Sequence, residues 1–414
     1  MDNLRSSKLA FKLGIVSLFI AGMIGLMLRW HYLSPIPGFL HKNWLHAHSH
    51  VAFLGWVFLA LIALINYFFR KDENFPEKKF IFLIWLTVIA NIGMLISFPI
   101  QGYGAVSIFF SAFHMVIGIY AFILYNKVFK SHNSFGIQLL RSAFIFMIIS
   151  GIGPIALGPI IALGYRDTFW YDFAVYFYLH FQYNGWFSMA IFGIIFLSLG
   201  TIKISRIWLY IINFSIVLTY LLSTLAIRPP AWVYYLGGFG ALLQIIPFIY
   251  LLILLLKNYK LILPASRPLT NAVLLISLMA FETKLYLQFF SSIPSIADWA
   301  LHSKNTIIAY LHFVLIGFIT SFLIGWWNKV MYKTDGQTYI FGSYFYLIGL
   351  AGIEFTLLFY VMGFFANYEL PYHLLIIFSI LLTAGILFYL IHFLKSINIP
   401  IRKALQEELT QEGD

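Results

Sequence analysis

The sequence contains no cysteine among its 414 residues. This absence excludes disulfide bonds, iron–sulfur clusters and thiolate metal sites. Charged residues are also scarce: they make up 10% of the chain, whereas hydrophobic residues make up 61% and aromatic residues 20%. A soluble globular domain carries about 25% charged residues. The composition therefore excludes a soluble globular protein.

Long apolar runs take the place of charged segments. A transmembrane helix needs roughly 20 apolar residues, and no internal sequence repeat is evident among the runs of this chain. We predict one all-α domain over residues 1–414, a polytopic membrane bundle of twelve transmembrane helices. The expected spans are 10–29, 46–68, 79–100, 104–125, 141–163, 174–199, 204–226, 231–256, 270–292, 306–327, 343–365 and 371–395.

Basic residues outnumber acidic residues, 26 to 15. They cluster near the N-terminus, in every second loop and in the C-terminal tail, which includes Arg402 and Lys403. Cytoplasmic loops of membrane proteins carry such an excess. We therefore expect an integral protein of a bacterial inner (plasma) membrane with both termini in the cytoplasm. The basic charge reflects topology and does not indicate a nucleic-acid partner.

Three histidines alternate near the start of the second expected span: His46, His48 and His50. Imidazoles inside a bilayer are costly and need a partner, such as a metal, a haem or a proton path. His46 and His50 are four residues apart and share a helix face, whereas His48 points elsewhere. A hydrated interfacial cluster is the alternative.

Histidines recur at a similar depth on other spans. His50, His180 and His312 each lie about six residues into a span, which is roughly 9 Å below the outer surface. His114 lies deeper, at about 15 Å. A neutral imidazole can bind iron or copper through one nitrogen while a neighbour orients the other. We therefore expect a haem or metal site, with His48, His114 and His180 as candidate metal ligands.

Two acidic residues, Glu282 and Glu354, lie within expected spans. Acids there are rare and mark a proton route or a paired charge, so both are candidate proton-relay residues. Lys284 lies on a different helix face from Glu282 and is not an obvious partner. Local pairing of Glu282 is the alternative. Arg228 is a candidate for binding a haem propionate, although a turn between helices explains it equally well.

The segment His46-Ala47-His48-Ser49-His50, followed by an apolar run and Gly55-Trp56-Val57, resembles the helix 2 motif of small oxidase-like proteins. With histidines on spans 2, 6 and 10, the chain resembles subunit I of the haem-copper oxidases and nitric oxide reductases. It also resembles the NnrS family of membrane proteins linked to nitric oxide stress. The resemblance implies a haem, expected to be b-type, held by His46 or His50 together with His312, and copper near His180.

The chain also departs from that family. Its oxidases place two adjacent histidines on the seventh span and two on the tenth. Here 204–226 contains no histidine and His312 is alone on its span. We therefore expect at most one haem, a second metal at His114 and His180, and no complete binuclear copper site.

These patterns predict a haem- or metal-binding membrane protein in respiratory electron transfer or nitric oxide handling. If it is an enzyme, it is an oxidoreductase acting on oxygen or nitric oxide. Its expected partners are the lipid bilayer, a diatomic gas ligand and an electron-donor subunit. Two alternatives stay open. One is a proton-coupled or metal-ion transporter, which predicts inverted repeats and helices broken at the midplane. The other is a non-catalytic scaffold or sensor.

Overall fold

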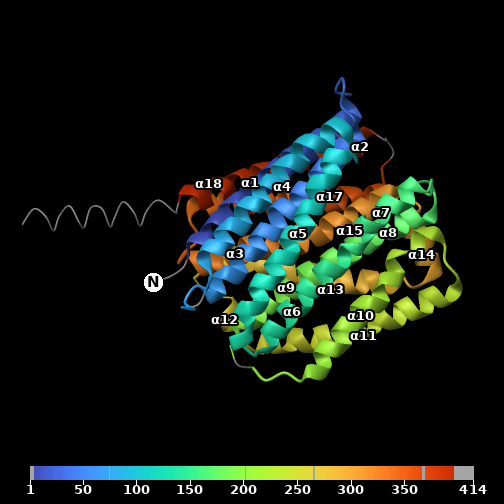
Figure 1. The fold of residues 1–414 in the computed structure, drawn as a ribbon. Helices are drawn as coiled ribbons and strands as arrows, with labels where there is room; N and C mark the ends of the chain where they lie inside the picture. The colour runs from blue at the N-terminus through green and yellow to red at the C-terminus, as the bar shows by residue number, and fades with distance from the viewer. Residues whose placement is uncertain (1–3, 74, 201, 264–265, 366–368, 396–414) are drawn as a thin grey trace, which may run out of the picture.

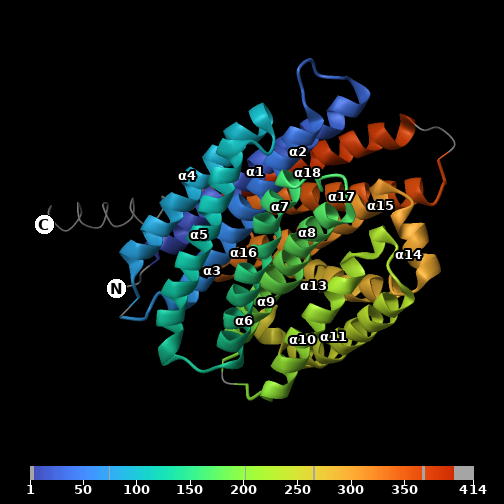
Figure 2. The same cartoon turned by 45° about the vertical axis from the view of Figure 1, so that its right-hand side comes forward.

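The computed structural model describes residues 4–73, 75–200, 202–263, 266–365 and 369–395. Arg402 and Lys403 of the basic tail lie outside the described residues. Every regular element in the described ranges is helical. The long helices pack side by side in one bundle (Figure 1), and the view in Figure 2 shows the same arrangement from a second side.

Eleven helices are long and apolar enough to cross a membrane. They confirm eleven of the expected spans. Four of them contain a π-helical or short 3₁₀ segment, which is included in the bounds. The eleven are α1 (Arg5–Leu33), α2–η1–α3 (His41–Phe69), α4 (Glu77–Gln101), α5–η2 (Ala105–Ser131), α6–α7 (Phe135–Ala162), α10–η4 (Arg206–Ile227), α11 (Ala231–Lys257), α13 (Pro268–Phe290), α15–η5–α16 (Lys304–Met331), α17 (Gln337–Val361) and α18 (Glu369–Lys395).

The span expected at 174–199 is helical but is not one of these eleven. There α8 (Phe169–His180), η3 (Phe181–Phe187) and α9 (Ser188–Ser198) follow one another without a break. Polar side chains in the first half make this segment less apolar than the other long helices. They are Asp172, His180, Gln182 and Asn184.

Three long helices form the centre of the bundle, and each consists of an α-helix, a π-helix and a second α-helix. They are α2–η1–α3, α8–η3–α9 and α15–η5–α16. In each, a histidine is the last residue before the π-helix: His50, His180 and His312. π-Helical turns are rare and occur frequently at functional sites. The π-helices therefore mark one level of the bundle, which we call the histidine end.

The central helices also share a sequence pattern, in which a glycine and then a large aromatic residue follow the histidine. The three pairs are Gly55-Trp56, Gly185-Trp186 and Gly317-Phe318, each the same distance after its histidine. A Cβ on Gly55 would lie 2.9 Å from Ser17 of α1, and one on Gly185 would lie 2.5 Å from Phe146 of α6. Glycine thus lets the helices approach closely at these levels. This short repeat was missed in the sequence because ordinary apolar residues surround it.

The first and third central helices run parallel and in register. Trp56 Nε1 donates to Thr320 Oγ1 at 3.0 Å, and farther along Tyr67 donates its hydroxyl to the Val330 carbonyl at 3.2 Å. The second central helix contacts both, through α9 against α3 and through η3 against η5. The halves that follow the π-helices form a solid apolar core. Its largest members are Trp56, Trp186, Trp326 and Trp327, all almost inaccessible.

Outer helices surround this centre, and α1 packs against α18 to close the ring. At the end opposite the histidines, Asn66 of α3 donates to Ser6 Oγ at 3.1 Å and accepts a hydrogen bond from the Tyr125 hydroxyl. Ser6 in turn donates through its backbone nitrogen (2.6 Å) and hydroxyl (2.7 Å) to the Glu77 carboxylate. This network joins the starts of α1 and α4 to the end of α3.

A second network of the same kind lies at the end of α16. Asn328 donates to Thr270 Oγ1 at 2.8 Å, and His392 Nε2 lies 3.1 Å from the Asn328 amide oxygen. Thr270 donates through its backbone nitrogen (3.3 Å) and hydroxyl (2.5 Å) to the Asp335 carboxylate. This network joins the start of α13 and the turn before α17 to the end of α16, as the first network joins α1 and α4 to α3.

Candidate functional site

The histidines at the histidine end lie in three separate groups around the central helices. His48 bonds to α1 and lies within electrostatic range of His312, whereas His46 and His50 pack against Phe98 of α4. His180 lies apart from both, against α10. Within the described residues, no three His, Asp or Glu side chains are close enough together to hold a metal ion. The histidines that were expected to share one site therefore do not form a single cluster.

The first group joins α1, α2 and α15. His48 Nδ1 donates to the Ala21 carbonyl at 2.8 Å, which leaves Nε2 with a lone pair. Gly25 lies directly against this ring, since a Cβ there would be 3.1 Å from His48 Cε1. His48 and His312 are close enough to interact electrostatically. His48 is thus the histidine of the second span that is turned toward His312.

Arg29 of α1 lies beside this pair. Its Nη1 donates to Ser379 Oγ at 2.7 Å and to the Leu375 carbonyl at 3.2 Å, which ties it to α18. Its Nη2 is directed at His312 Nδ1 at 3.5 Å. Glu354 of α17 is near enough for its charge to interact with that of Arg29, and one of its carboxylate oxygens is buried without a partner. A cation and an acid therefore flank the two imidazoles.

His48, His312 and Arg29 are all partly exposed. By contrast, the halves of the central helices beyond the π-helices are nearly inaccessible. The histidine end is therefore the more accessible half of the central helices.

The second group joins α2, α4 and α5. His50 Nδ1 donates to the His46 carbonyl at 2.9 Å, and its ring centroid lies 4.4 Å from that of Phe98. Tyr103, in the turn after α4, packs edge-on against His46 at 4.5 Å, and burial raises the pKa of its phenol. His114 of α5 interacts with His50. The Nε2 atoms of His46 and His114 are buried without hydrogen-bond partners.

The third group surrounds His180, and both of its ring nitrogens are engaged. Nε2 donates to the Ile216 carbonyl at 2.8 Å. A carbonyl only accepts, so Nε2 carries the proton and Nδ1 is an acceptor. Nδ1 lies 2.9 Å from Ser223 Oγ and 3.1 Å from Asn184 Nδ2. A metal could bind Nδ1 only if both of those partners moved away.

Lys284 of α13 completes the third group. It is 1% exposed, and its Nζ donates to the Asn184 side-chain oxygen. Glu282 is half-buried on the same helix, and the two side chains do not act on each other. Sequence reasoning recognised Lys284 only as a charge within a span. Its partner lies in another span, so helix spacing could not identify it.

Arg228 is exposed in the turn between α10 and α11. Its backbone is left-handed, with φ of 50°, and two prolines follow. Such a φ is uncommon outside glycine and fits a tight turn. Arg29, and not Arg228, is the arginine directed at a histidine. The signal that could have identified it is an arginine at the end of the first apolar run.

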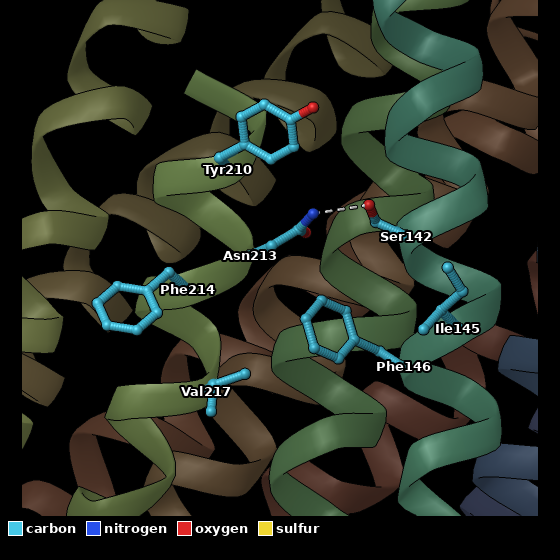
Figure 3. Close-up of a pocket in the computed structure, with 7 residues that line it drawn as sticks. All are labelled: Ser142, Ile145, Phe146, Tyr210, Asn213, Phe214 and Val217. Atoms are coloured by element: carbon cyan, nitrogen blue, oxygen red, sulfur yellow. Dashed lines mark hydrogen bonds between the residues drawn. The ribbon is translucent and has the colours of Figure 1, made fainter. Parts of the chain in front are cut away.

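A groove of about 360 Å³ lies on the flank of the bundle between α6 and α10 (Figure 3). Asn213 donates to Ser142 Oγ across it at 3.0 Å, and the rest of its lining is mainly apolar. The remaining lining residues are Ile145, Phe146, Tyr210, Phe214 and Val217. The groove contains none of the histidines and is separate from the three groups.

No protein-family model matches the chain, and no curated protein matches it significantly. Functional inference therefore depends on the residues and on their arrangement.

Proposed function

We propose that the chain is a haem-binding membrane protein with the architecture of haem-copper oxidase subunit I. In this proposal it crosses a bacterial inner membrane twelve times, with α8–η3–α9 as the additional span and both termini in the cytoplasm. It acts in respiratory electron transfer or in the handling of nitric oxide. The observation that carries the proposal is the pairing of His48 with His312 beside Arg29.

The arrangement of the helices supports this architecture. Each of the three central helices carries a histidine, and a π-helix begins directly after that histidine. The first and third run parallel, and each ends in a network of the same kind. A transporter of inverted-repeat design would have equivalent helices running in opposite directions. The parallel repeat therefore favours the oxidase-like reading over that alternative.

The residues of the first group fit a haem held by two histidines. His48 is fixed by its Nδ1 hydrogen bond and offers Nε2, the arrangement usual for a metal-binding histidine. His312 lies on α15, and both rings are partly exposed. Its Nδ1 accepts from Arg29 in this structure, so Nε2 carries the proton and would have to lose it to bind iron. When bound, a haem would supply one-electron chemistry. Arg29 would supply positive charge beside it, and Glu354 is a candidate to hold a proton there.

The proposal moves the axial position on the second span from His46 or His50 to His48. The sequence showed that alternate histidines occupy different faces but not which face meets the tenth span. His50 instead packs on Phe98 of α4. His114 and His180, expected to share a second metal, lie in different groups, and His180 has both nitrogens engaged. We propose no copper ligand set for this chain.

The test is an optical spectrum of the purified protein, oxidised and dithionite-reduced, with iron analysis of the same sample. We expect a sharp reduced α-band and stoichiometric iron. His48→Ala and His312→Ala should each lose this band. A featureless spectrum from folded protein supplied with haem would refute the proposal.

Two matched variants sharpen the assignment. His50→Ala lies on the same helix two residues away, and His132→Ala lies at the opposite end of the bundle. Both should retain haem. If His50→Ala loses haem and His48→Ala retains it, the haem ligand on the second span is on the face of His50 and not at His48.

A further inference from the structure

Lys284 is the least expected residue of the bundle interior. It is 1% exposed, and Asn184, its hydrogen-bond acceptor, is also 1% exposed. An ammonium has three N–H donors, and the described residues provide one acceptor, the Asn184 oxygen. Its other close neighbour is the ring of Phe281, 5.7 Å from Nζ. An unpaired charge in this setting is costly, so it requires a counter-charge or loss of its proton.

Nothing around Lys284 in the described part of the chain supplies a negative charge. Its one hydrogen bond goes to the Asn184 amide, and none joins it to an acidic side chain, including Glu282 on its own helix. His180 cannot supply one either. Its Nε2 is protonated and donates a hydrogen bond to the Ile216 carbonyl. Its Nδ1 already accepts hydrogen bonds from Ser223 and Asn184.

The other polar groups of this compartment are hydroxyls, which can donate as well as accept hydrogen bonds. The Tyr183 hydroxyl lies near the side chains of Ser223, Tyr310 and Asn184. These groups and the ammonium come from η3, α10, α15 and α13. A compartment that holds a cation and hydroxyl donors but no paired acid is chemically complementary to an anion.

We infer that the compartment formed by Lys284, Asn184, His180, Tyr183 and Tyr310 binds a small monovalent anion, such as chloride, azide or nitrite. The ammonium supplies the charge, and the tyrosine hydroxyls supply hydrogen bonds. The ligand must be small because Lys284, Asn184 and His180 are almost fully enclosed. The site lies apart from His48 and His312, so it is independent of the proposed haem.

Azide is a suitable probe because its infrared stretching band reports directly on its surroundings. We expect wild-type protein to show a bound-azide band distinct from that of free azide. The band should persist in His48→Ala and His312→Ala, which cannot hold the haem. It should disappear in Lys284→Met and shift in frequency in Lys284→Arg, which keeps the charge.

Asn184→Asp provides a second test that does not remove the lysine. The new carboxylate would pair with Lys284 and replace the anion, so the azide band should be lost while the protein stays folded. A band that survives in both Lys284→Met and Asn184→Asp would overturn the inference. A band that vanishes only in the two histidine variants would also overturn it, because the azide would then be bound at the haem.

Discussion

Asn66 and Asn328 occupy the same position on two different central helices, each the same distance in sequence after its histidine. Each donates to a hydroxyl at the start of another span, and that hydroxyl donates to a carboxylate. Two residues far apart in the chain thus make matching contacts. The second central helix has Phe196 at this place. Within the described residues, such a network therefore lies at the ends of α3 and α16, and α9 has no asparagine at the equivalent position to form one.

Removing either asparagine should destabilise the protein. Asn66→Ala and Asn328→Ala each leave buried polar partners without a hydrogen bond, a loss of about 1–3 kcal/mol in the free energy of unfolding. Reversible unfolding in mixed micelles measures this. Ser49→Ala, at a half-buried position whose hydroxyl donates to the Leu45 carbonyl of its own helix, is the control and should change stability by less than about 0.5 kcal/mol. Wild-type stability of Asn328→Ala would contradict the matching roles.

The three glycines of the central helices should differ in their tolerance of alanine. A Cβ on Gly185 would lie 2.5 Å from Phe146 Cβ, whereas one on Gly317 would lie 3.6 Å from Ala280 Cβ, an ordinary contact. Overpacking costs about 1–3 kcal/mol. Gly185→Ala should therefore destabilise most and Gly317→Ala least, with Gly55→Ala between them. The same unfolding assay ranks the three, and the reverse order would contradict the close approach at Gly185.

The bond between Trp56 and Thr320 should be measurable as a coupling. Trp56→Phe and Thr320→Val each remove one partner of a buried hydrogen bond, and each should cost about 1 kcal/mol or more. Because both variants remove the same interaction, the double variant should cost less than the sum of the two. Strict additivity would show that the bond contributes nothing to the register of the first and third central helices.

Arg29 and Glu354 should change the reduction potential of the proposed haem in opposite directions. Arg29→Met removes a positive charge next to His312, so the oxidised haem is favoured and the midpoint potential falls. Glu354→Gln removes an acid near the same site, so the potential should rise wherever the carboxyl is ionised. Redox titration followed at the α-band measures both shifts. Unchanged potentials in haem-loaded variants would show that neither charge lies near the iron.

The sequence was sufficient to predict the helical class, eleven spans and a histidine level. Each depends on local information, such as the length of an apolar run or the position of His180 within it. The sequence could not predict which of those histidines lie close to one another. Residues two apart on a helix point in different directions, and only the packing against α1 shows that His48 is the one facing His312.

Long-range partners explain most of what was missed. Lys284 and Asn184 lie on separate spans, and no rule of helix spacing connects them. Arg29 is the last residue of the expected span 10–29 and drew no attention there, but α1 continues to Leu33 and keeps it inside the bundle. The acids Glu282 and Glu354 could be selected from the sequence, because a charged residue within an apolar run is unusual whatever its partner in the fold.

The π-helices carry one further consequence. A π-turn accommodates one more residue than an α-turn, so each central helix behaves as an α-helix with an insertion just after its histidine. One residue corresponds to a rotation of about 100° around the helix axis. The inserted residue changes the angle between the histidine and the glycine that follows it. Gly55, Gly185 and Gly317 can therefore lie against α1, α6 and α13, while the histidines lie on other faces of their helices. Deleting one residue from Val51–Val57 would turn His48 away from His312 without altering any side chain at either position.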